Sequence, residues 1–384
     1  MIHYSIPFIG KEEASAASRA VSDKHIQGEG SICKEAEAFM RRMLGTGAVY
    51  LVTSGTHALE LSLMALGISS GDEVICPSFT FVSTANAILR QGGKPVFCEI
   101  EDRTLNIDID DAMRRVTKRT RAIIPVHYGG LSCDMGRLVR EASRRKIYIV
   151  EDAAQAVGAA FDGRMLGTFG ELGCLSFHST KNITCGEGGA LIVNKKSLID
   201  AVQIGREKGT NRSLFLEGKI AKYTWIGLGS SFVISDVLAS ILLEQLKKLD
   251  AVTERRRAIC SQYYSAFKDL AMDGRIAISQ PDARSAGNGH IFWALMDNSI
   301  SRKEFIENMR CLGVECTHHY VPLHSSPFAT ERLGYKKEDL PVTEDLAARL
   351  VRFPVYPSLS VGDIDKVIDS AKKLLRKEKS WLKR

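Results

Sequence analysis

Hydrophobic and polar residues alternate along the first two thirds of the chain in short blocks of two different periods. Runs of four or five apolar and β-branched residues, such as 49–53 (VYLVT) and 147–150 (IYIV), predict buried strands. Between such runs lie longer segments with apolar residues three or four positions apart, as in 56–66 and 135–145, which predict helices. This alternation favours an α/β fold, with a mostly parallel sheet covered by helices on both faces.

The same pattern predicts the remaining elements and a change of organisation near residue 250. Further strands are expected at residues 73–76, 95–98, 122–126, 148–151, 174–177 and 190–193, and a further helix at 80–90. A long helix is expected over 236–249, and beyond it the composition turns to basic helix and loop. We therefore expect a large domain over residues 1–250 and a smaller C-terminal α+β domain over residues 251–384.

Composition places the chain among ordinary globular proteins. It has 384 residues, of which 45% are hydrophobic and 25% charged, and this excludes disordered, collagenous and coiled-coil chains. No run approaches the roughly 18 uninterrupted apolar residues of a transmembrane helix. The first residues lack the basic and apolar regions of a secretory signal, so we expect a cytoplasmic protein.

The net charge of +7 is concentrated at one end of the chain. Residues 372–384 hold seven Lys or Arg and one Glu, which leaves the rest of the chain near +1. A terminal amphipathic helix with a solvated basic end is the favoured interpretation, ahead of an anionic membrane surface or an acidic partner, and no nucleic acid is expected. The nine cysteines are scattered without metal-ligand spacing, so no metal is expected.

Two helices begin directly after predicted strands with residues that suit a ligand. The run Thr53-Ser54-Gly55-Thr56 would expose backbone N–H groups at a helix N-terminus, where a phosphate binds well, although an ordinary helix cap is the favoured explanation of this run taken alone. Phe81 lies at the start of the helix after the strand 73–76. Its ring either packs in the core or stacks on a planar ligand.

Charged residues follow two further predicted strands. Glu151 and Asp152 end the strand 148–151, and a carboxylate there needs a cationic partner, for which a structural Arg or a helix cap is the simple alternative. Lys181 lies in a loop of Ser, Thr, His and Gly residues after the strand 174–177. Most lysines are solvated surface groups, so this position alone is a weak signal.

Taken together, the four positions meet one chemical demand. A pyridine-ring cofactor with a phosphate arm needs a phosphate site, a stacking surface and an acid that keeps the ring nitrogen protonated. It also needs a lysine whose amine forms a Schiff base with its aldehyde. The chain supplies these groups in order, with Lys181 29 residues after Asp152.

In these residues and in the segments around them, the chain resembles the DegT/DnrJ/EryC1/StrS family of pyridoxal-phosphate sugar aminotransferases. The resemblance implies a type I, aspartate-aminotransferase-like fold and pyridoxal 5′-phosphate as cofactor. Among members of the family, those that move an amino group from L-glutamate to C4 of dTDP-4-dehydro-6-deoxy-D-glucose are the most similar. The segments that carry the resemblance are PSFTFVSTANA (77–87), PVHYGG (125–130), IVEDAAQ (149–155), SFHSTKN (176–182), REKGTNRS (206–213), KYTW (222–225) and HYVPLH (319–324).

The resemblance also implies roles for individual residues. Lys181 is the residue that bonds covalently to the cofactor, and Asp152 pairs with the pyridine nitrogen. Phe81 stacks on the ring, and Gln155 contacts the ring hydroxyl. The phosphate ligands implied are Gly55, Thr56 and Ser176. The presence of Lys181 also argues against the dehydratase branch of the family, in which a histidine replaces this lysine.

The sequence departs from many relatives at a position that implies a dimer. Those relatives have G-x-N-x-R, and the Asn reaches the phosphate of a neighbouring subunit; here Ser231 replaces the Asn and Val233 the Arg. A serine can still donate to phosphate, so a homodimer with shared active sites remains the expectation. On the substrate side, the resemblance points to His319, Tyr320, His324 and Arg212 for the nucleotide sugar or glutamate, with structural roles as the alternative.

Two other interpretations stay open. One keeps the chemistry and changes the substrate to a 3-keto sugar or a UDP-linked sugar. The other is a non-catalytic protein that binds the cofactor for a regulatory role, which the intact set of Lys181, Asp152 and Phe81 argues against.

Overall fold

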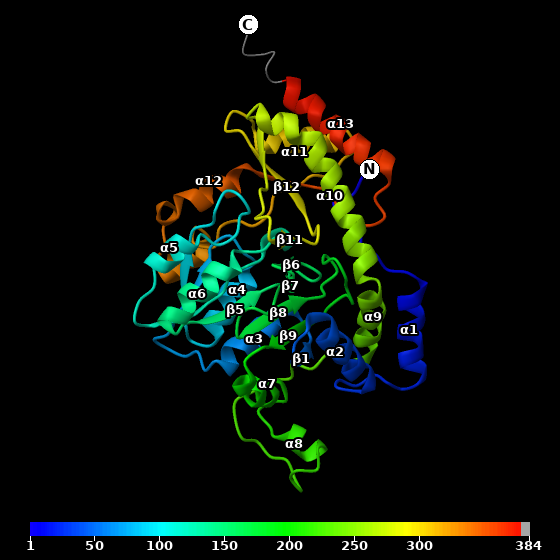
Figure 1. Ribbon diagram of the computed structural model, residues 1–384, viewed down its shortest axis with the longest axis vertical. Helices are drawn as coiled ribbons and strands as arrows, with labels where there is room; N and C mark the ends of the chain where they lie inside the picture. The colour runs from blue at the N-terminus through cyan, green and yellow to red at the C-terminus, as the bar shows by residue number, and fades with distance from the viewer. Residues whose placement is uncertain (378–384) are drawn as a thin grey trace.

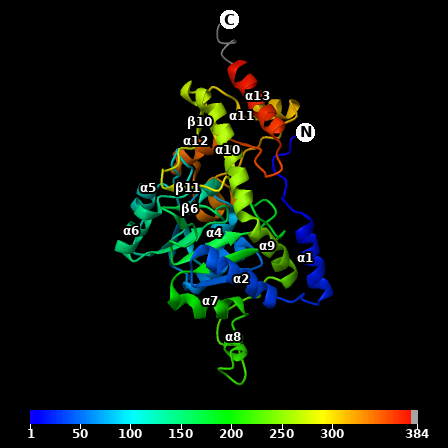
Figure 2. The ribbon, with the colours of Figure 1, turned by 45° about the vertical axis from the view of Figure 1, so that its right-hand side comes forward.

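The computed structural model describes residues 1–377, which form an elongated molecule with two sheets at different heights along its long axis (Figure 1). The larger sheet lies in the middle of the molecule, and the smaller one lies nearer the C-terminus. Helix α10 (Leu249–Met272) runs from beside the smaller sheet towards the larger one. Helix α8 (Arg212–Leu216) lies on a segment that projects from the opposite end (Figures 1 and 2).

The larger sheet has seven strands in the order β1-β9-β8-β5-β4-β2-β3. Every neighbouring pair from β8 to β3 is parallel, and β9 alone runs antiparallel to its neighbours β1 and β8. The mostly parallel sheet predicted from the sequence is therefore confirmed, and each strand expected in it overlaps an observed one. The strands are β1 (Ala48–Val52), β2 (Glu73–Pro77), β3 (Lys94–Cys98), β4 (Thr120–Ile123), β5 (Tyr148–Asp152), β8 (Leu172–Ser176) and β9 (Gly189–Val193).

Alternating side chains of these strands enter two separate cores, one on each face of the sheet. In β1, Val49 and Leu51 belong to one buried cluster, whereas Ala48 and Val52 belong to the other. Burial on both faces explains why the strands read as nearly continuous apolar runs. The first core is covered by α2 (Ser31–Leu44), α6 (Met135–Arg145) and α9 (Asp236–Lys247), and the second by α3 (Gly55–Ala65), α4 (Val82–Arg90) and α7 (Ile199–Arg206).

The smaller sheet has its own core. Strands β10 (Ile276–Ile278), β12 (Phe292–Met296) and β13 (Leu350–Phe353) pair antiparallel, and helices α10, α11 (Arg302–Cys311) and α13 (Val361–Lys377) pack on them. The start of the chain joins this core, because Ile2 is buried in it and pairs with Val314. The domain boundary near residue 250 stays a prediction.

The end of the chain follows the predicted pattern as far as it is described. Apolar residues of α13, among them Ile364, Val367 and Leu375, are buried in the core of the smaller sheet. Residues 378–384, which hold much of the predicted basic end, lie outside the described residues. Over residues 1–377, helices of the length and apolar character needed to cross a membrane are not found.

The remaining α-helices are α1 (Lys11–Ser22), α5 (Ile109–Arg114) and α12 (Pro341–Arg349). The short strands β6 (Ala160–Phe161), β7 (Arg164–Met165) and β11 (Ser285–Ala286) form a third sheet.

The arrangement directs several strand ends to one place. Strands β1, β2, β5 and β8 run in the same direction, so their carboxyl ends meet at the same edge of the sheet. Helices α3 and α4 begin directly after β1 and β2 at this edge. A crevice beyond the carboxyl ends of parallel strands is where ligands bind in such folds.

Candidate active site

The turn between β1 and α3 brings hydroxyl groups from three elements to one helix N-terminus. The Thr56 and Ser83 hydroxyl oxygens lie 2.7 Å apart, and Ser176 ends strand β8. Gly55 permits this close approach, because a Cβ there would stand 2.8 Å from the Cβ of Ser176. The first N–H groups of a helix have no acceptor within it and carry partial positive charge. The hydroxyl groups and the helix N-terminus together suit a phosphate.

The two aromatic residues before α4 have opposite surroundings. Phe79 is buried against Tyr128 and Tyr320, whereas Phe81, two residues later, is 55% exposed and lies on the wall of a cavity. A large apolar ring exposed at the start of a helix, beside polar groups, is available for stacking. The sequence left open whether Phe81 packs in the core or faces a ligand. Phe79 is the residue that packs in the core, and Phe81 faces the cavity.

Asp152, the last residue of β5, is a buried carboxylate that faces the cavity. Its Oδ2 accepts a hydrogen bond from the Thr84 hydroxyl (2.8 Å), and its Oδ1 accepts one from the backbone N–H of Ala154 (3.2 Å). Burial raises the pKa of Asp152, while these hydrogen bonds and the nearby Lys181 oppose the rise. A buried carboxylate held in this way favours a cationic ligand group beside it.

The neighbouring Glu151 points to a different set of partners. One of its oxygens lies 3.0 Å from Nε2 of His127, and the two oxygens accept hydrogen bonds from the backbone N–H groups of Gly167, Phe169 and Gly170. Of the two acids, Glu151 is therefore the one whose carboxylate is held by structural partners within the protein. Asp152 is left to face the cavity.

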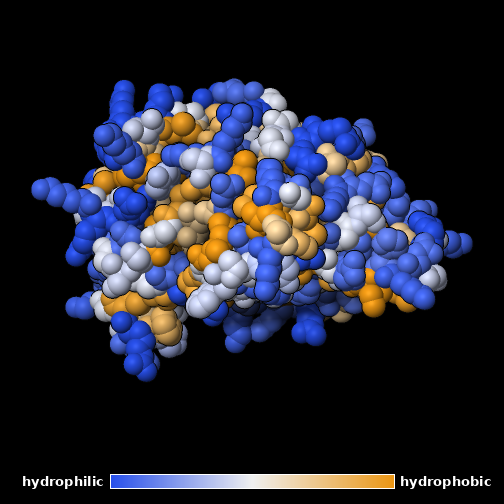
Figure 3. Space-filling view, turned by 90° about the horizontal axis from the view of Figure 1, so that it is seen from below, coloured by the Kyte–Doolittle hydropathy of each residue, from blue (hydrophilic) through white to orange (hydrophobic). Residues whose placement is uncertain are grey.

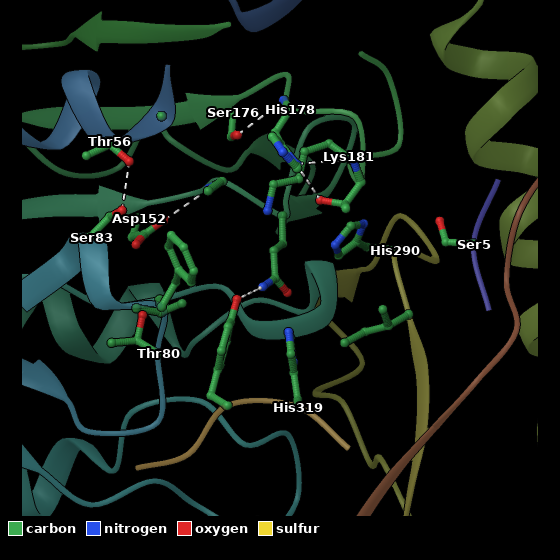
Figure 4. A pocket seen from close by; sticks show the side chains of 18 of the residues that line it. Ser5, Thr56, Thr80, Ser83, Asp152, Ser176, His178, Lys181, His290 and His319 are labelled. Atoms are coloured by element: carbon green, nitrogen blue, oxygen red, sulfur yellow. Dashed lines mark hydrogen bonds between the residues drawn. The ribbon is translucent and has the colours of Figure 1, made fainter. Parts of the chain in front are cut away.

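Lys181 lies in the loop after β8 with its amine directed to the cavity (Figure 4). Among the described residues, none forms a hydrogen bond or ion pair with this amine. Burial lowers the pKa of Lys181 to about 8; Asp152 opposes the shift and Arg352 adds to it. The loop is fixed on both sides, because the Asn182 side chain contacts His290 and the Thr184 hydroxyl donates to the Phe177 carbonyl.

Gln155 and Tyr320 form a second polar group across the cavity. The side-chain amide of Gln155 donates to the Tyr320 hydroxyl (2.8 Å), and its carbonyl accepts from the Gly129 backbone N–H (2.7 Å). His319 stacks on Tyr320, with ring centroids 3.7 Å apart, and its Nδ1 lies 2.7 Å from the hydroxyl of Tyr128. Burial and the nearby Arg352 hold the pKa of His319 well below its usual value, so its ring is neutral.

These groups line one cavity of about 500 Å³ (Figure 4). Asp152, Lys181 and Ser176 come from the edge of the larger sheet, whereas His319 and Tyr320 come from the segment after α11. The structure thus brings together most of the site residues predicted from the sequence. Those that line the cavity are Gly55, Thr56, Phe81, Asp152, Gln155, Ser176, Lys181, His319 and Tyr320.

Two of the predicted site residues line a different, smaller cavity. Ser231 and Arg212 lie on the walls of a space of about 370 Å³, where Arg212 forms ion pairs with Glu29 (3.1 Å) and Glu207 (3.5 Å). Within one subunit neither residue lines the cavity that contains Lys181. The predicted contact of Ser231 with a phosphate therefore requires a second copy of the chain.

The side chain of His324 is enclosed by other protein groups and lines neither cavity. It is fully buried, its Nδ1 lies 2.7 Å from the Ser78 hydroxyl, and its Nε2 lies 3.2 Å from the Lys337 carbonyl oxygen. Both ring nitrogens have protein partners, so the predicted substrate contact is replaced by a structural one. The physical reason is that His324 lies within the turn at residues 323–326, where its ring is enclosed by Ser78 and the Lys337 carbonyl group.

Some residues that the sequence did not single out support the lining of the cavity from behind, and others line it. Thr84 holds Asp152, and Tyr128 holds His319. Arg256 and Arg352 line the side of the cavity that is formed by α10 and the smaller sheet. Thr84 lies within the segment 77–87, three residues and so about one helical turn after Phe81, and this spacing could have identified it from the sequence. The sequence around the two arginines contains no comparable pattern.

The residues present fit a phosphate-bearing pyridine cofactor. Gly55 lets Ser176 approach the N-terminus of α3, both residues line the cavity, and the exposed ring of Phe81 offers a stacking surface. Asp152 offers a buried anion for a ring nitrogen, and Lys181 offers an amine with a lowered pKa. This combination defines the chain's cavity as a site for pyridoxal phosphate.

Comparison with known proteins agrees with this assignment. Spore coat polysaccharide biosynthesis protein SpsC of Bacillus subtilis is 33% identical, over 97% of each chain. The aminotransferase TlmJ from Streptoalloteichus hindustanus has a similar structure, with a TM-score of 0.90 and 30% identity, covering 99% of this chain and 100% of that one. The sugar aminotransferase Spr1654 from Streptococcus pneumoniae in its pyridoxal-phosphate form gives a TM-score of 0.90 at 25% identity, covering 98% of this chain and 99% of that one.

The fold and the site together define a pyridoxal-phosphate-dependent aminotransferase of type I fold. The match of residues 7–372 to the DegT/DnrJ/EryC1/StrS aminotransferase family covers nearly the whole chain, and the chain belongs to this family. The resemblance, the fold class and the cofactor expected from the sequence are therefore confirmed.

Proposed function

We propose that the protein transfers the amino group of L-glutamate to C4 of dTDP-4-dehydro-6-deoxy-D-glucose, giving dTDP-4-amino-4,6-dideoxy-D-galactose. The observation that carries the chemistry is the single cavity in which Lys181, Asp152, Phe81 and the N-terminus of α3 face one another. The sugar and the nucleotide are supported by the segments 206–213 and 222–225, which resemble the C4-aminating members of the family.

Each residue of the cavity has a role in this proposal. Bound pyridoxal phosphate supplies an electron sink for the charge that develops as the amino donor loses its α-proton. Asp152 holds a negative charge beside the ring nitrogen and so keeps it protonated. Lys181 takes the proton from the donor α-carbon in the first half-reaction, and gives a proton to sugar C4 in the second. Gln155 contacts the ring hydroxyl.

The remaining roles divide between the two ends of the cofactor. Phe81 stacks on the ring. Gly55, Thr56 and Ser176 bind the phosphate through backbone N–H and hydroxyl groups. His319 and Tyr320, on the opposite wall, contact the sugar. His319 presents a neutral ring, which suits a hydrogen bond to a sugar hydroxyl rather than an ion pair.

The active sites are proposed to be shared in a homodimer. Ser231 and Arg212 lie near a projecting segment that exposes large apolar side chains, and Figure 3 shows apolar groups gathered among polar ones on the face from which this segment projects. Exposed apolar patches of this kind mark protein interfaces. Ser231 of one subunit would then donate to the phosphate bound by the other. The exposed side chains are Leu214, Phe215, Leu216, Tyr223, Trp225, Ile226 and Leu228.

Sharing of sites can be tested by subunit complementation. Ser231→Trp should block the donated contact, and Lys181→Ala should remove the amine, so each variant alone is expected to be inactive. A mixed dimer would contain one intact site. Return of activity after the two variants are refolded together supports shared sites, whereas continued inactivity of a proven mixed dimer contradicts them.

The cellular role follows from the product. An amino-deoxy sugar nucleotide made in the cytoplasm is a precursor for a surface polysaccharide, lipopolysaccharide or common-antigen glycolipid. The name of the Bacillus subtilis relative, a spore coat polysaccharide biosynthesis protein, supports a role of this kind. A 3-keto sugar or a UDP-linked sugar is the alternative substrate, and a non-catalytic regulatory role is the alternative function.

The test is a two-step absorption spectrum of the cofactor-loaded protein. L-glutamate is added and the excess amino acid is removed, and dTDP-4-dehydro-6-deoxy-D-glucose is then added. Loss and return of the band of the lysine-bound cofactor would establish both half-reactions and the C4 substrate. Loss without return would move the assignment to another keto sugar, and no response to glutamate would favour the regulatory role.

A further inference from the structure

The first residues of the chain form part of the wall of the active-site cavity. Tyr4 and Ser5 line it, and the guanidinium carbon of Arg352 lies 4.6 Å from the centre of the Tyr4 ring (Figure 4). Residues 4–9 (the N-terminal segment) lead from this wall to α1. In Figures 1 and 2 the segment runs from the level of the smaller sheet down to α1. What holds this segment in place therefore also shapes the cavity.

The N-terminal segment is fastened by hydrogen bonds at its two ends. The backbone N–H of Tyr4 donates to the Glu315 carboxylate (3.1 Å), and the Phe8 carbonyl oxygen accepts from Nε2 of Gln245 (2.7 Å). Between these points, residues 5–7 form no hydrogen bond with any described residue. The path of the segment along the cavity therefore depends on Gln245 at one of its two fixed ends.

The fully buried side chain of Gln245, on α9, also contacts the loop that carries the catalytic lysine. Its Oε1 accepts a hydrogen bond from the backbone N–H of Thr184 (3.1 Å), three residues after Lys181 in the same loop between β8 and β9. Its Nε2 donates a second hydrogen bond, to the Glu13 carboxylate of α1 (2.8 Å). One side-chain amide thus joins the N-terminal segment, α1 and the lysine loop, with both donors and an acceptor in use.

The surroundings of Glu13 fix which way the Gln245 amide points. Glu13 is 1% exposed; Nζ of Lys248 lies 2.7 Å from one of its carboxylate oxygens, and the other accepts from the Gly10 N–H (2.7 Å). Burial raises the pKa of Glu13, but the hydrogen bonds from Lys248, Gln245 and Gly10 outweigh it and lower the pKa overall. An ionised carboxylate only accepts hydrogen bonds, so the amide nitrogen of Gln245 must face it. The amide oxygen is thereby left for the lysine loop.

We propose that Gln245 is a positioning residue for aminotransfer, which holds the N-terminal segment against the cavity with its amide nitrogen and the lysine loop with its amide oxygen. The two structures that it joins line the same cavity, the segment through Tyr4 and Ser5 and the loop through Lys181. The inference rests on aminotransferase chemistry and is independent of which sugar accepts the amino group. The competing interpretation is that Gln245 only stabilises the fold, and the experiments are designed to separate the two.

The first measurement uses Gln245→Leu, which keeps the approximate size of the side chain and removes all three hydrogen bonds. In the cofactor-loaded protein, KM for both substrates should rise about 3- to 30-fold, because only a fraction of the molecules would keep the segment in its binding position. The value of kcat should fall about tenfold as Lys181 loses its fixed position. The visible circular dichroism of the lysine-bound cofactor should weaken. Gln280→Leu is the matched control, since Gln280 is exposed and lines neither cavity.

The second measurement uses Gln245→Glu, which separates the two sides of the amide. A carboxyl group keeps an oxygen acceptor for the Thr184 N–H but retains at most one of the two donors, and only when it is protonated. The visible circular dichroism should therefore stay close to that of the wild type. The N-terminal segment should detach more often, so chymotrypsin cleavage after Phe8 should become about 3- to 30-fold faster, with Gln280→Glu as the control. This variant also serves if Gln245→Leu does not fold.

The outcomes separate the inference from a structural role and from the proposed function. A lower melting temperature with unchanged cleavage, KM and circular dichroism would make Gln245 merely structural and overturn the inference. Equal loss of the circular dichroism signal in Gln245→Glu and Gln245→Leu would overturn the assignment of the amide oxygen to the lysine loop. If the variants differ as expected but dTDP-4-dehydro-6-deoxy-D-glucose restores the cofactor band in none of the proteins, the role of Gln245 stands and the proposed sugar fails.

Discussion

The two walls of the cavity differ in how completely their polar groups are satisfied. On the wall formed by the larger sheet, Asp152 has two hydrogen-bond donors, and the hydroxyl groups of Thr56 and Ser83 contact each other. On the second wall, formed by α10 and the smaller sheet, Arg256 and Arg352 keep donors without acceptors among the described residues. From this difference we expect the first wall to hold a cofactor that stays bound and the second to contact substrates that enter and leave.

This difference predicts how mutations should act. Changes on the sheet wall should affect both half-reactions, because both use the same cofactor. Changes on the second wall should affect the substrates unequally and by smaller factors.

The largest effect is expected for Lys181→Ala. Without its amine the protein cannot bond covalently to the cofactor or transfer protons, and kcat should fall by at least about 10⁴-fold, as for other residues that bond to the reacting group. The absorption band of the lysine-bound cofactor should be absent while the circular dichroism spectrum is retained. Lys303→Ala, with a side chain 84% exposed, is the control. Retained turnover in Lys181→Ala would contradict the proposed mechanism.

The adjacent acids offer the next comparison. Asp152→Asn removes a charge that faces the cavity, and kcat should fall by about 10²- to 10³-fold with the cofactor still bound. Glu151→Gln instead disturbs a carboxylate that accepts three backbone hydrogen bonds and contacts His127, so it should cost about 1.5–3 kcal/mol of unfolding free energy. Thermal unfolding and steady-state kinetics measure the two effects. If both variants lose activity and stability alike, the division of roles is wrong.

The same pair shows how much of the site the sequence could predict. Asp152, Lys181 and Phe81 each lie just after a strand that the apolar pattern revealed, so their convergence followed from the topology of a parallel sheet. The pattern also located the strands of the larger sheet to within a few residues. It did not show which of the two acids would meet His127, because that depends on which side of β5 each side chain points to.

The second wall could not be predicted for a related reason. Arg255, Arg256 and Arg257 follow one another in the sequence, and each is turned about 100° from the next around α10. Arg255 donates to the Pro357 and Leu359 carbonyl oxygens and Arg257 to that of Gly287, so only Arg256 reaches the cavity. The rotation of the helix is set by its packing in the core of the smaller sheet, which leaves no mark in the arginine run itself.

His319 and His324, five residues apart, have different surroundings for a similar reason. His319 lines the cavity, whereas His324 is enclosed by the Ser78 hydroxyl and the Lys337 carbonyl oxygen. Both belong to the segment HYVPLH, and both were predicted to contact substrate. The partners that distinguish them lie far away in the sequence, and no local pattern identifies them.

The pH dependence of cofactor loading should report on Lys181. The neutral amine is the nucleophile, and burial lowers the pKa of Lys181 to about 8. Below that pH the loading rate should rise about tenfold per pH unit, because the neutral fraction does, and above it the rate should level off. An amine with an ordinary pKa would instead give a rate that continues to rise to about pH 10. The measurement is the growth of the absorption band when the cofactor is added to the cofactor-free protein.

The smallest effect is expected for Tyr128→Phe, because Tyr128 lies behind the cavity wall and contacts the lining residue His319. The hydroxyl of Tyr128 lies 2.7 Å from Nδ1 of His319, while the His319 ring also stacks on Tyr320. The stack should keep the ring in place, so the substitution removes one hydrogen bond that orients a neutral imidazole, worth about 0.5–1.5 kcal/mol. We expect KM for the keto sugar to rise by about two- to tenfold, with kcat nearly unchanged. The first half-reaction with L-glutamate should be unaffected, because His319 is proposed to contact only the sugar. Equal losses in both half-reactions would show that Tyr128 supports the cofactor side as well, and the two walls would then not be separate in function.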